Sequence, residues 1–184
     1  MNKKILSAGL LSAMIFASAN ANAFYVGAGV GSSKAKVDGD TYDKETAFTV
    51  SAGMSIPLPL IPIRGEIELL NLKSGDDEVE GKIYGAAANA YVGLPLLPIV
   101  KPYVGMGLAY SQMKYSDATI PFSGKSEWKV RPQYMIGLDL DLPLIPIAGG
   151  IEYRYMDTSF GGKDFPTDVD TKVHTVLVKG RVYF

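Results

Sequence analysis

The chain has 184 residues, of which 20% are charged, with no cysteine and one histidine. Its 18 basic and 19 acidic residues exclude a strongly basic nucleic-acid binder, and the missing thiols exclude zinc ribbons and enzymes with a cysteine nucleophile. The 20 glycines and 11 tyrosines favour extended strands over helices, so an all-β chain is the starting expectation.

Residues 1–23 have the features of a cleaved signal peptide. Lys3 and Lys4 precede an apolar stretch, residues 5–19, which is shorter than the roughly 20 residues of a membrane-spanning helix. Ala21 and Ala23 then supply a small-residue cleavage pattern. We therefore expect residues 24–184 to form a single exported domain.

Three proline-containing turns divide that domain. Residues 55–63, 93–99 and 141–147 share a Pro-Leu-Leu/Ile-Pro-Ile core. Because proline cannot donate a ladder hydrogen bond, each copy is expected to end one strand and lead into the next. Longer polar segments alternate with these turns, at residues 33–46, 73–82, 112–127 and 157–172. The predicted strands are residues 24–32, 47–56, 63–72, 83–94, 100–111, 128–142, 147–156 and 173–184.

Side chains alternate between two faces along each predicted strand. One face is apolar and bulky, as at Val26, Phe48, Leu108 and Ile136. The other face is small or polar, and it carries every charged residue of the eight stretches: Arg64, Glu66, Glu68, Lys101, Lys129, Arg131, Asp139, Asp141, Glu152, Arg154, Lys179 and Arg181.

The bulk of the apolar face decides which face points outward. The interior of an eight-stranded barrel is only just wide enough for side chains, so the bulky face must contact lipid. An open sheet edge in lipid would leave backbone groups unpaired, so the strands must close on themselves. The sequence therefore predicts an all-β fold, an eight-stranded antiparallel up-and-down transmembrane β-barrel.

Three segments resemble the small outer-membrane β-barrel superfamily, which includes the opacity proteins and the membrane domain of outer-membrane protein A. They are the opening Phe24-Tyr-Val-Gly-Ala-Gly-Val-Gly31, the strand Lys101-Pro-Tyr-Val-Gly-Met-Gly-Leu-Ala-Tyr110, and the ending Val176-Leu-Val-Lys-Gly-Arg-Val-Tyr-Phe184. The resemblance implies location in the outer membrane of a Gram-negative cell. It also implies that Val182 and the terminal Phe184 belong to a signal for the barrel-assembly machinery.

The twelve inward charges are expected to pair with one another, because unpaired charge is costly away from water. Their near balance of signs predicts a salt-bridged lumen, with Glu66 and Glu68 against Arg154 and Arg181 as the first pairs to test. A gated ion path whose salt bridges rearrange is the alternative.

Two further features are weaker candidates for sites. Asp76, Asp77, Glu78 and Glu80 form an acidic run that could bind divalent cations, but no EF-hand spacing accompanies it and a solvated loop is favoured. A Ser-His-acid enzyme would have to use His174, whose parity puts it on the lipid side. We expect no enzyme activity, no metal and no cofactor.

The predicted function is structural: membrane integrity, or display of loops at the cell surface. The alternatives are a surface adhesin and a narrow pore or conduit for a hydrophobic ligand. The expected partners are outer-membrane lipids, lipopolysaccharide and the assembly machinery, with a host surface ligand in the adhesin case and no nucleic acid.

Overall fold

The computed structural model describes residues 24–37, 40–41, 45–56, 61–76, 79–94, 99–117, 122–141, 145–162 and 165–184. Residues 1–23, where we predict the signal peptide, lie outside the described residues. The long strands are β1 (Phe24–Val37), β3 (Glu45–Ile56), β4 (Ile63–Asp76), β5 (Val79–Gly93), β6 (Val100–Asp117), β8 (Lys129–Asp141), β9 (Ile147–Gly162) and β10 (Phe165–Tyr183). Two short strands, β2 (Asp40–Thr41) and β7 (Phe122–Lys125), pair with the ends of β1 and β6. No helix among the described residues is long and apolar enough to cross a membrane.

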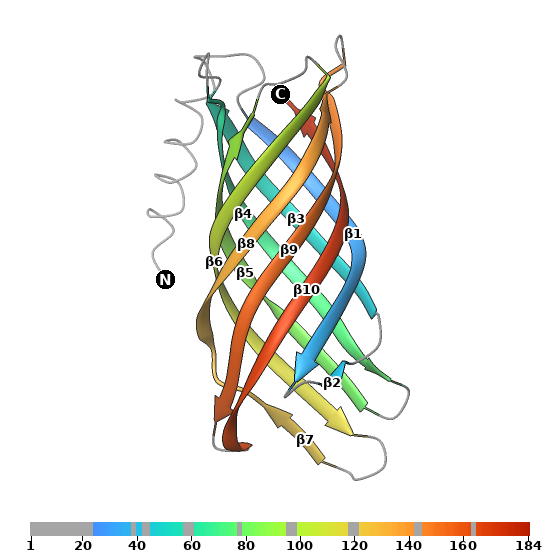
Figure 1. The fold of residues 1–184 in the computed structure, drawn as a ribbon, viewed down its shortest axis with the longest axis vertical. Coiled ribbons are helices and arrows are strands. Elements are labelled where there is room, and N and C mark those ends of the chain that lie inside the picture. Colours follow the sequence, from blue (N-terminus) through green and yellow to red (C-terminus); the bar gives the residue numbers. More distant parts are fainter. Residues whose placement is uncertain are drawn as a thin grey trace, which may run out of the picture.

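The eight long strands close into a barrel. Each pairs antiparallel with the next in chain order, and β10 pairs with β1 to complete the circle (Figure 1). Following paired residues once around the barrel leads from Tyr25 to Ala35, a shift of ten residues along β1. With about 3.3 Å per residue and about 4.8 Å between strands, this shift tilts the strands by roughly 40° from the barrel axis. The predicted fold is confirmed.

The two ends of the barrel differ in their connections. At one end, which we call the turn end, the short proline-containing segments join β3 to β4, β5 to β6 and β8 to β9. At the other end, which we call the loop end, lie β2, β7 and the tips of the long hairpins (Figure 1). In transmembrane barrels the short connections face the periplasm and the longer ones face outward.

Alternation along the strands separates the lipid face from the lumen as predicted. Ile67 and Leu69 on β4, Met106 on β6 and Val178 on β10 all expose about 60% or more of their area. Their neighbours Glu66, Glu68 and Lys179 are buried in the lumen. Lipid is the environment that an outward surface of this kind requires.

The strands are longer than predicted at the loop end. Pairing of β4 with β5 continues to Asp76 opposite Val79, and pairing of β9 with β10 continues to Gly162 opposite Phe165. Large parts of the polar segments that we expected to be connections are therefore paired strands of hairpins. Antiparallel neighbours already in register extend their ladder into water, whatever the polarity of the side chains.

The lumen is polar only over part of its length, which corrects the expectation of a small, polar inner face. Toward the loop end it is filled by a cluster of buried apolar side chains, which we call the apolar layer: Ala47, Leu70, Leu72, Ile83, Ala87, Ala109, Met156, Val173 and Leu177, with Met113 packed against them. Each of these buried residues lies at an inward-facing position of its strand. Buried apolar contact in place of water fills this part of the barrel.

Glycines make room for lumen tyrosines on neighbouring strands. Tyr103 on β6 is paired with Gly137 on β8, and a Cβ built on that glycine would lie 2.4 Å from the tyrosine Cζ. Gly105 meets Tyr91 in the same way, with a Cβ 2.5 Å from the ring. The tyrosine rings can therefore lie across the adjacent strand and reach the middle of the lumen.

We expect the Gly137→Ala variant to lose about 1–3 kcal/mol of unfolding free energy, because the added methyl overlaps Tyr103 and the carbonyl oxygen of Ile151. Urea unfolding in detergent micelles would measure this. Gly65→Ala is the matched control, because a Cβ there meets nothing within 4 Å. Equal stability of the two variants would show that the ring does not need the glycine.

Candidate functional site

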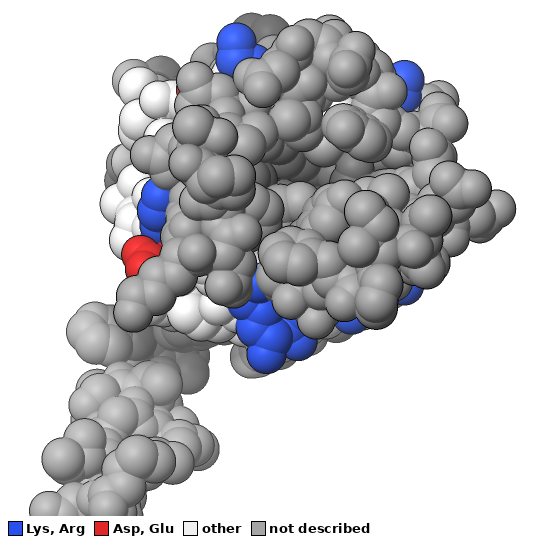
Figure 2. Space-filling model, turned by 90° about the horizontal axis from the view of Figure 1, so that it is seen from below, with Lys and Arg blue, Asp and Glu red and all other residues white. Residues whose placement is uncertain are grey.

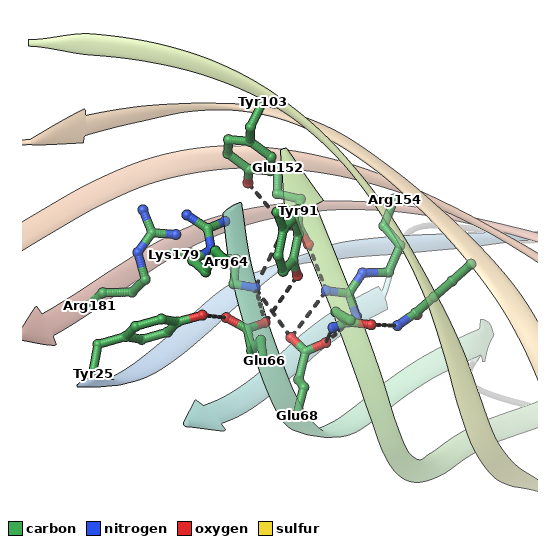
Figure 3. A network of polar contacts seen from close by, with 12 residues as sticks. Tyr25, Arg64, Glu66, Glu68, Tyr91, Tyr103, Glu152, Arg154, Lys179 and Arg181 are labelled. Carbon is green, nitrogen blue, oxygen red and sulfur yellow. Dashed lines mark hydrogen bonds and ion pairs between the residues drawn. The ribbon is translucent and has the colours of Figure 1, made fainter. Parts of the chain in front are cut away.

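The candidate site is the polar network in the turn-end part of the lumen. Its side chains come from β1, β4, β5, β6, β8, β9 and β10 and converge on the barrel axis (Figure 3). Neither in this network nor elsewhere do the described residues contain a group of three or more histidines or acids that could hold a metal ion.

Five charged residues form the central group of the network. Arg154 lies between two carboxylates, with Nη1 2.7 Å from Oε2 of Glu68 and Nη2 2.6 Å from Oε1 of Glu152. Lys179 Nζ lies 3.0 Å from Glu66 Oε1 and 3.5 Å from Glu68 Oε1. These five side chains are at most 1% exposed. Burial removes solvent screening, so each charge depends on its neighbours for compensation.

A second group, nearer the turn end, centres on Asp139. Arg64 Nη1 donates a 2.6 Å hydrogen bond to Asp139 Oδ2. Arg181 Nη2 lies 2.6 Å from Asp139 Oδ1, an ion pair without the alignment of a hydrogen bond. This group has one positive charge in excess, whereas the central group has three acids against two bases and one negative charge in excess. The two groups are neutral only together.

Tyrosines connect the two groups. The guanidinium of Arg64 lies 4.3 Å from the ring centre of Tyr91 and 4.9 Å from that of Tyr103. The Tyr91 hydroxyl donates to Glu66 at 3.0 Å, and the Tyr103 hydroxyl donates to Glu152 at 3.0 Å. Each ring therefore contacts a cation of one group while its hydroxyl bonds a carboxylate of the other (Figure 3).

Amides and a third tyrosine complete the bonding of the carboxylates. Tyr25 donates to Glu66 at 2.9 Å, and Asn89 Nδ2 donates to Glu68 at 3.1 Å. Gln133 Nε2 in turn donates to Asn89 Oδ1 at 2.5 Å. Buried carboxylates that are bonded from several strands hold those strands in register.

The remaining predicted lumen charges lie apart from these groups. Lys101 Nζ is 2.6 Å from Asp141 Oδ2, and this pair is more than one-third exposed at the turn end. Arg131, on the loop-end side, donates from Nη1 to the Ser111 carbonyl oxygen at 2.8 Å. Lys129 is half-buried, two residues before Arg131 on β8. The twelve residues thus do not form one cluster.

The pairing differs in part from the pairs that we singled out for testing. Arg154 contacts Glu68, but Arg181 contacts Asp139, and Glu66 takes Lys179 as its cationic partner. Tyr25, Tyr91 and Tyr103 are not among the site residues predicted from the sequence, although each occupies an inward-facing position of its strand. Their register opposite Gly53, Gly105 and Gly137 is the signal that identifies them.

The turn end of the lumen opens into a cavity of about 330 Å³. Arg64, Asp139, Tyr91 and Tyr103 form part of its wall, together with apolar residues such as Ile147. The cavity therefore reaches the second charged group from the periplasmic side. The central group and the apolar layer lie beyond it toward the loop end.

The other predicted site residues lie outside the lumen. Val182 and Phe184 face outward, and the Phe184 amide donates to the Phe24 carbonyl at the seam between β10 and β1. His174 also faces outward, with Nδ1 2.6 Å from the Tyr153 hydroxyl.

The acidic run is described only in part. Asp77 and Glu78 lie outside the described residues, and of Asp76 and Glu80 only the backbone is described. Cation binding there stays a prediction.

We expect Arg154→Gln to lower the unfolding free energy by about 3–5 kcal/mol, because it leaves Glu68 and Glu152 buried beside one lysine. Urea unfolding in micelles followed by heat-modifiable gel mobility would measure the loss. Lys101→Gln, which breaks the half-exposed pair, should change stability by less than about 1 kcal/mol. Adding Glu68→Gln to Arg154→Gln should recover part of the loss; strictly additive losses would contradict the pairing.

Comparisons with known proteins agree with this architecture. The family profile described as "Outer membrane protein beta-barrel domain" matches residues 5–181. Among solved structures, Neisserial surface protein A superposes with a TM-score of 0.68 at 19% identity, covering 90% of this chain and 99% of that chain. Ail, the attachment invasion locus protein of Yersinia pestis, superposes with a TM-score of 0.59 at 17% identity, covering 90% of this chain and 100% of that chain.

At these low sequence identities, the structural similarity shows that the fold is shared. No curated protein sequence matches the chain significantly. The family profile nevertheless spans almost the whole chain. This protein therefore belongs to the outer-membrane protein β-barrel domain family and is located in the outer membrane.

Proposed function

We propose that the protein is a closed structural barrel that supports the outer membrane and presents its loop-end hairpins at the cell surface. The observation that carries the proposal is the filled lumen. An ion entering from the turn-end cavity meets Arg64 and Asp139, then the central group, and then the apolar layer. Leu72, Met156 and Leu177 in that layer are each at most 2% exposed.

The interlocked charges suit a scaffold better than a gated pore. The central group bonds side chains from β1, β4, β5, β6, β9 and β10, so a path could open only by separating several buried pairs together. Removing one partner of a buried pair costs about 3–5 kcal/mol, which makes spontaneous opening rare. A catalytic role has no support either, because His174 faces lipid beside two tyrosines.

Purified barrel in planar bilayers should give no conductance steps above those of the bare bilayer, whereas a porin measured in parallel should give them. Heat-modifiable mobility of the same preparation would establish that the barrel is folded. Sustained steps from folded protein would overturn the closed-barrel proposal. A change of ion selectivity in Arg154→Gln would then locate the path in the lumen.

A surface adhesin is the second candidate, and the length of the hairpins favours it. A tilted strand needs about 9–11 residues to cross the membrane, but β6 has 18 and β10 has 19. The residues beyond those needed to cross the membrane lie at the loop end, where the paired strands of the hairpins would hold a binding surface in place. The structure of Ail in the comparison contains the heparin analogue sucrose octasulfate, so a sulfated glycan is the first ligand to test here.

The β4–β5 hairpin offers a direct test of the adhesin candidate. Lys73 is paired with Lys82, so residues 74–81 can be replaced by an Asn-Gly turn without changing the strand register. The variant should keep heat-modifiable mobility. If the protein is an adhesin, the variant should also bind less to immobilised heparin fragments or host cells. Unchanged binding after the same replacement of residues 159–170 in the β9–β10 hairpin as well would count against adhesion through these hairpins.

We also propose that Val182 and Phe184 serve as the assembly signal. Both are exposed on the outward face of the last strand, next to the β1–β10 seam. A machinery that closes the barrel at this seam would find them accessible.

A further inference from the structure

A row of four lysines crosses the outer surface of the barrel near the loop end. Lys73 on β4 is paired with Lys82 on β5, Lys82 with Lys114 on β6, and Lys114 with Lys125 on β7. We call these four residues the lysine row. Residues in directly opposed positions have Cβ atoms about 4.5–5.5 Å apart and share one face of the sheet. Lys73, Lys114 and Lys125 are exposed and Lys82 is half-buried.

Like charges in opposed positions destabilise a sheet, and this row repeats the arrangement three times. Lys82, Lys114 and Lys125 form no ion pair with any acid whose side chain is described. Glu127, the described acid nearest to Lys125 in the chain, is exposed. Among the side chains that the structure describes, no carboxylate therefore pairs with these three lysines, and an external anion would offset their charge.

The aromatic residues next to the row fix its height relative to the membrane. Trp128 stacks on Tyr110 with ring centres 4.9 Å apart, and it meets Tyr84 edge-on at 5.5 Å. The Tyr84 hydroxyl bonds Gln112, and Lys114 Nζ lies 5.0 Å from the centre of the Tyr84 ring. A lipid-facing cluster of this kind is typical of the aromatic girdle at the membrane interface.

The strand geometry gives the same height. Ten residues separate Leu94 at the turn end from Tyr84 on the outward face. At about 3.3 Å per residue and a tilt of roughly 40°, they span about 25 Å along the barrel axis, which is the usual height of the apolar band. Lys82 is the next outward residue beyond Tyr84. The lysine row thus lies at the headgroup level of the outer leaflet.

We propose that the lysine row is a binding site for the phosphate groups of a phosphorylated outer-leaflet glycolipid, the lipid A portion of lipopolysaccharide. Phosphates would neutralise the repulsion between the opposed ammonium groups. The acyl chains of the same molecule would pack on the apolar surface below the girdle, which includes Leu108, Ala86 and Val130. This placement against lipid favours a membrane glycolipid over a soluble polyanion, since a soluble ligand would not contact the apolar surface.

Seen from the loop end, Lys and Arg side chains appear at several places around the barrel (Figure 2). Lys172 on β10 lies between Lys36 on β1 and Asp157 on β9, and Lys34 on β1 is paired with His174, so this side holds one directly opposed lysine pair where the lysine row holds three. An acid opposite Lys172 reduces the need for an external anion there. Lys34 and Lys172 therefore provide a control with the same number of charges at the same end of the barrel.

The test compares K82Q/K114Q with K34Q/K172Q, each reconstituted in phosphatidylcholine vesicles with and without diphosphoryl lipid A. Retention of heat-modifiable mobility would show that both variants are folded. Binding can be followed by energy transfer from Trp128, which is the only tryptophan, to lipid A labelled on an acyl chain. At about 1 kcal/mol per lysine, K82Q/K114Q should bind lipid A about thirtyfold more weakly than the unmodified protein. K34Q/K172Q should bind within about threefold of it, and removing the lipid A phosphates should mimic K82Q/K114Q.

Four results would overturn the proposal. One is equal affinity of the two double variants for lipid A. Another is full energy transfer to lipid A that lacks its phosphates. A third is loss of heparin-fragment binding in K82Q/K114Q with lipid A binding unchanged, which would assign the row to a soluble sulfated glycan. Competition by inorganic phosphate alone at millimolar concentration would likewise show that the row binds phosphate without recognising the lipid.

Discussion

The constraint on which this structure depends is the absence of water around the strands. Backbone groups in lipid have no partner except a neighbouring strand, so the sheet must close, and closure needs the pairing of β10 with β1. The same lipid requires an apolar outer surface. The charged side chains of the spanning segments are therefore confined to the lumen, where little water can solvate them.

The lumen meets this requirement by distributing charge over two groups. Asp139 alone cannot balance Arg64 and Arg181, and the two central cations cannot balance three glutamates. Tyr91 and Tyr103 join the groups, because their rings contact Arg64 and their hydroxyls bond carboxylates. The charges are therefore compensated only by the two groups together. Substitution of any one residue of the central group removes a contact from partners on several strands.

The outer surface also changes in composition where the membrane changes from acyl chains to headgroups. Apolar residues give way to the Tyr84, Tyr110 and Trp128 cluster and then to the lysine row, in the order in which a membrane changes from acyl chains to headgroups. The lumen, by contrast, changes from charged at the turn end to apolar toward the loop end. The interior is therefore filled by two different kinds of packing, whereas the outer surface changes at the aromatic cluster.

The alternation of residues determined much of this from the sequence alone. Period-two spacing places Glu66 and Glu68 on the face opposite Ile67 and Leu69 whatever the register, so the strands, their faces and the lipid-facing surface could be predicted. Leu70 and Leu72 share the parity of those glutamates, but a pattern that expects a polar inner face passes over them. The extension of the hairpins was also missed, because polar composition does not reveal how far a ladder continues.

Only the tertiary structure decided which charges meet. Arg181 and Asp139 lie on strands that are not adjacent, and their contact depends on the ten-residue shift accumulated around the barrel and on side chains reaching across it. The alignment of Lys82, Lys114 and Lys125 likewise depends on the register of each strand pair. Register follows from closure of the whole sheet, because a single strand carries no information about how far its neighbours are shifted.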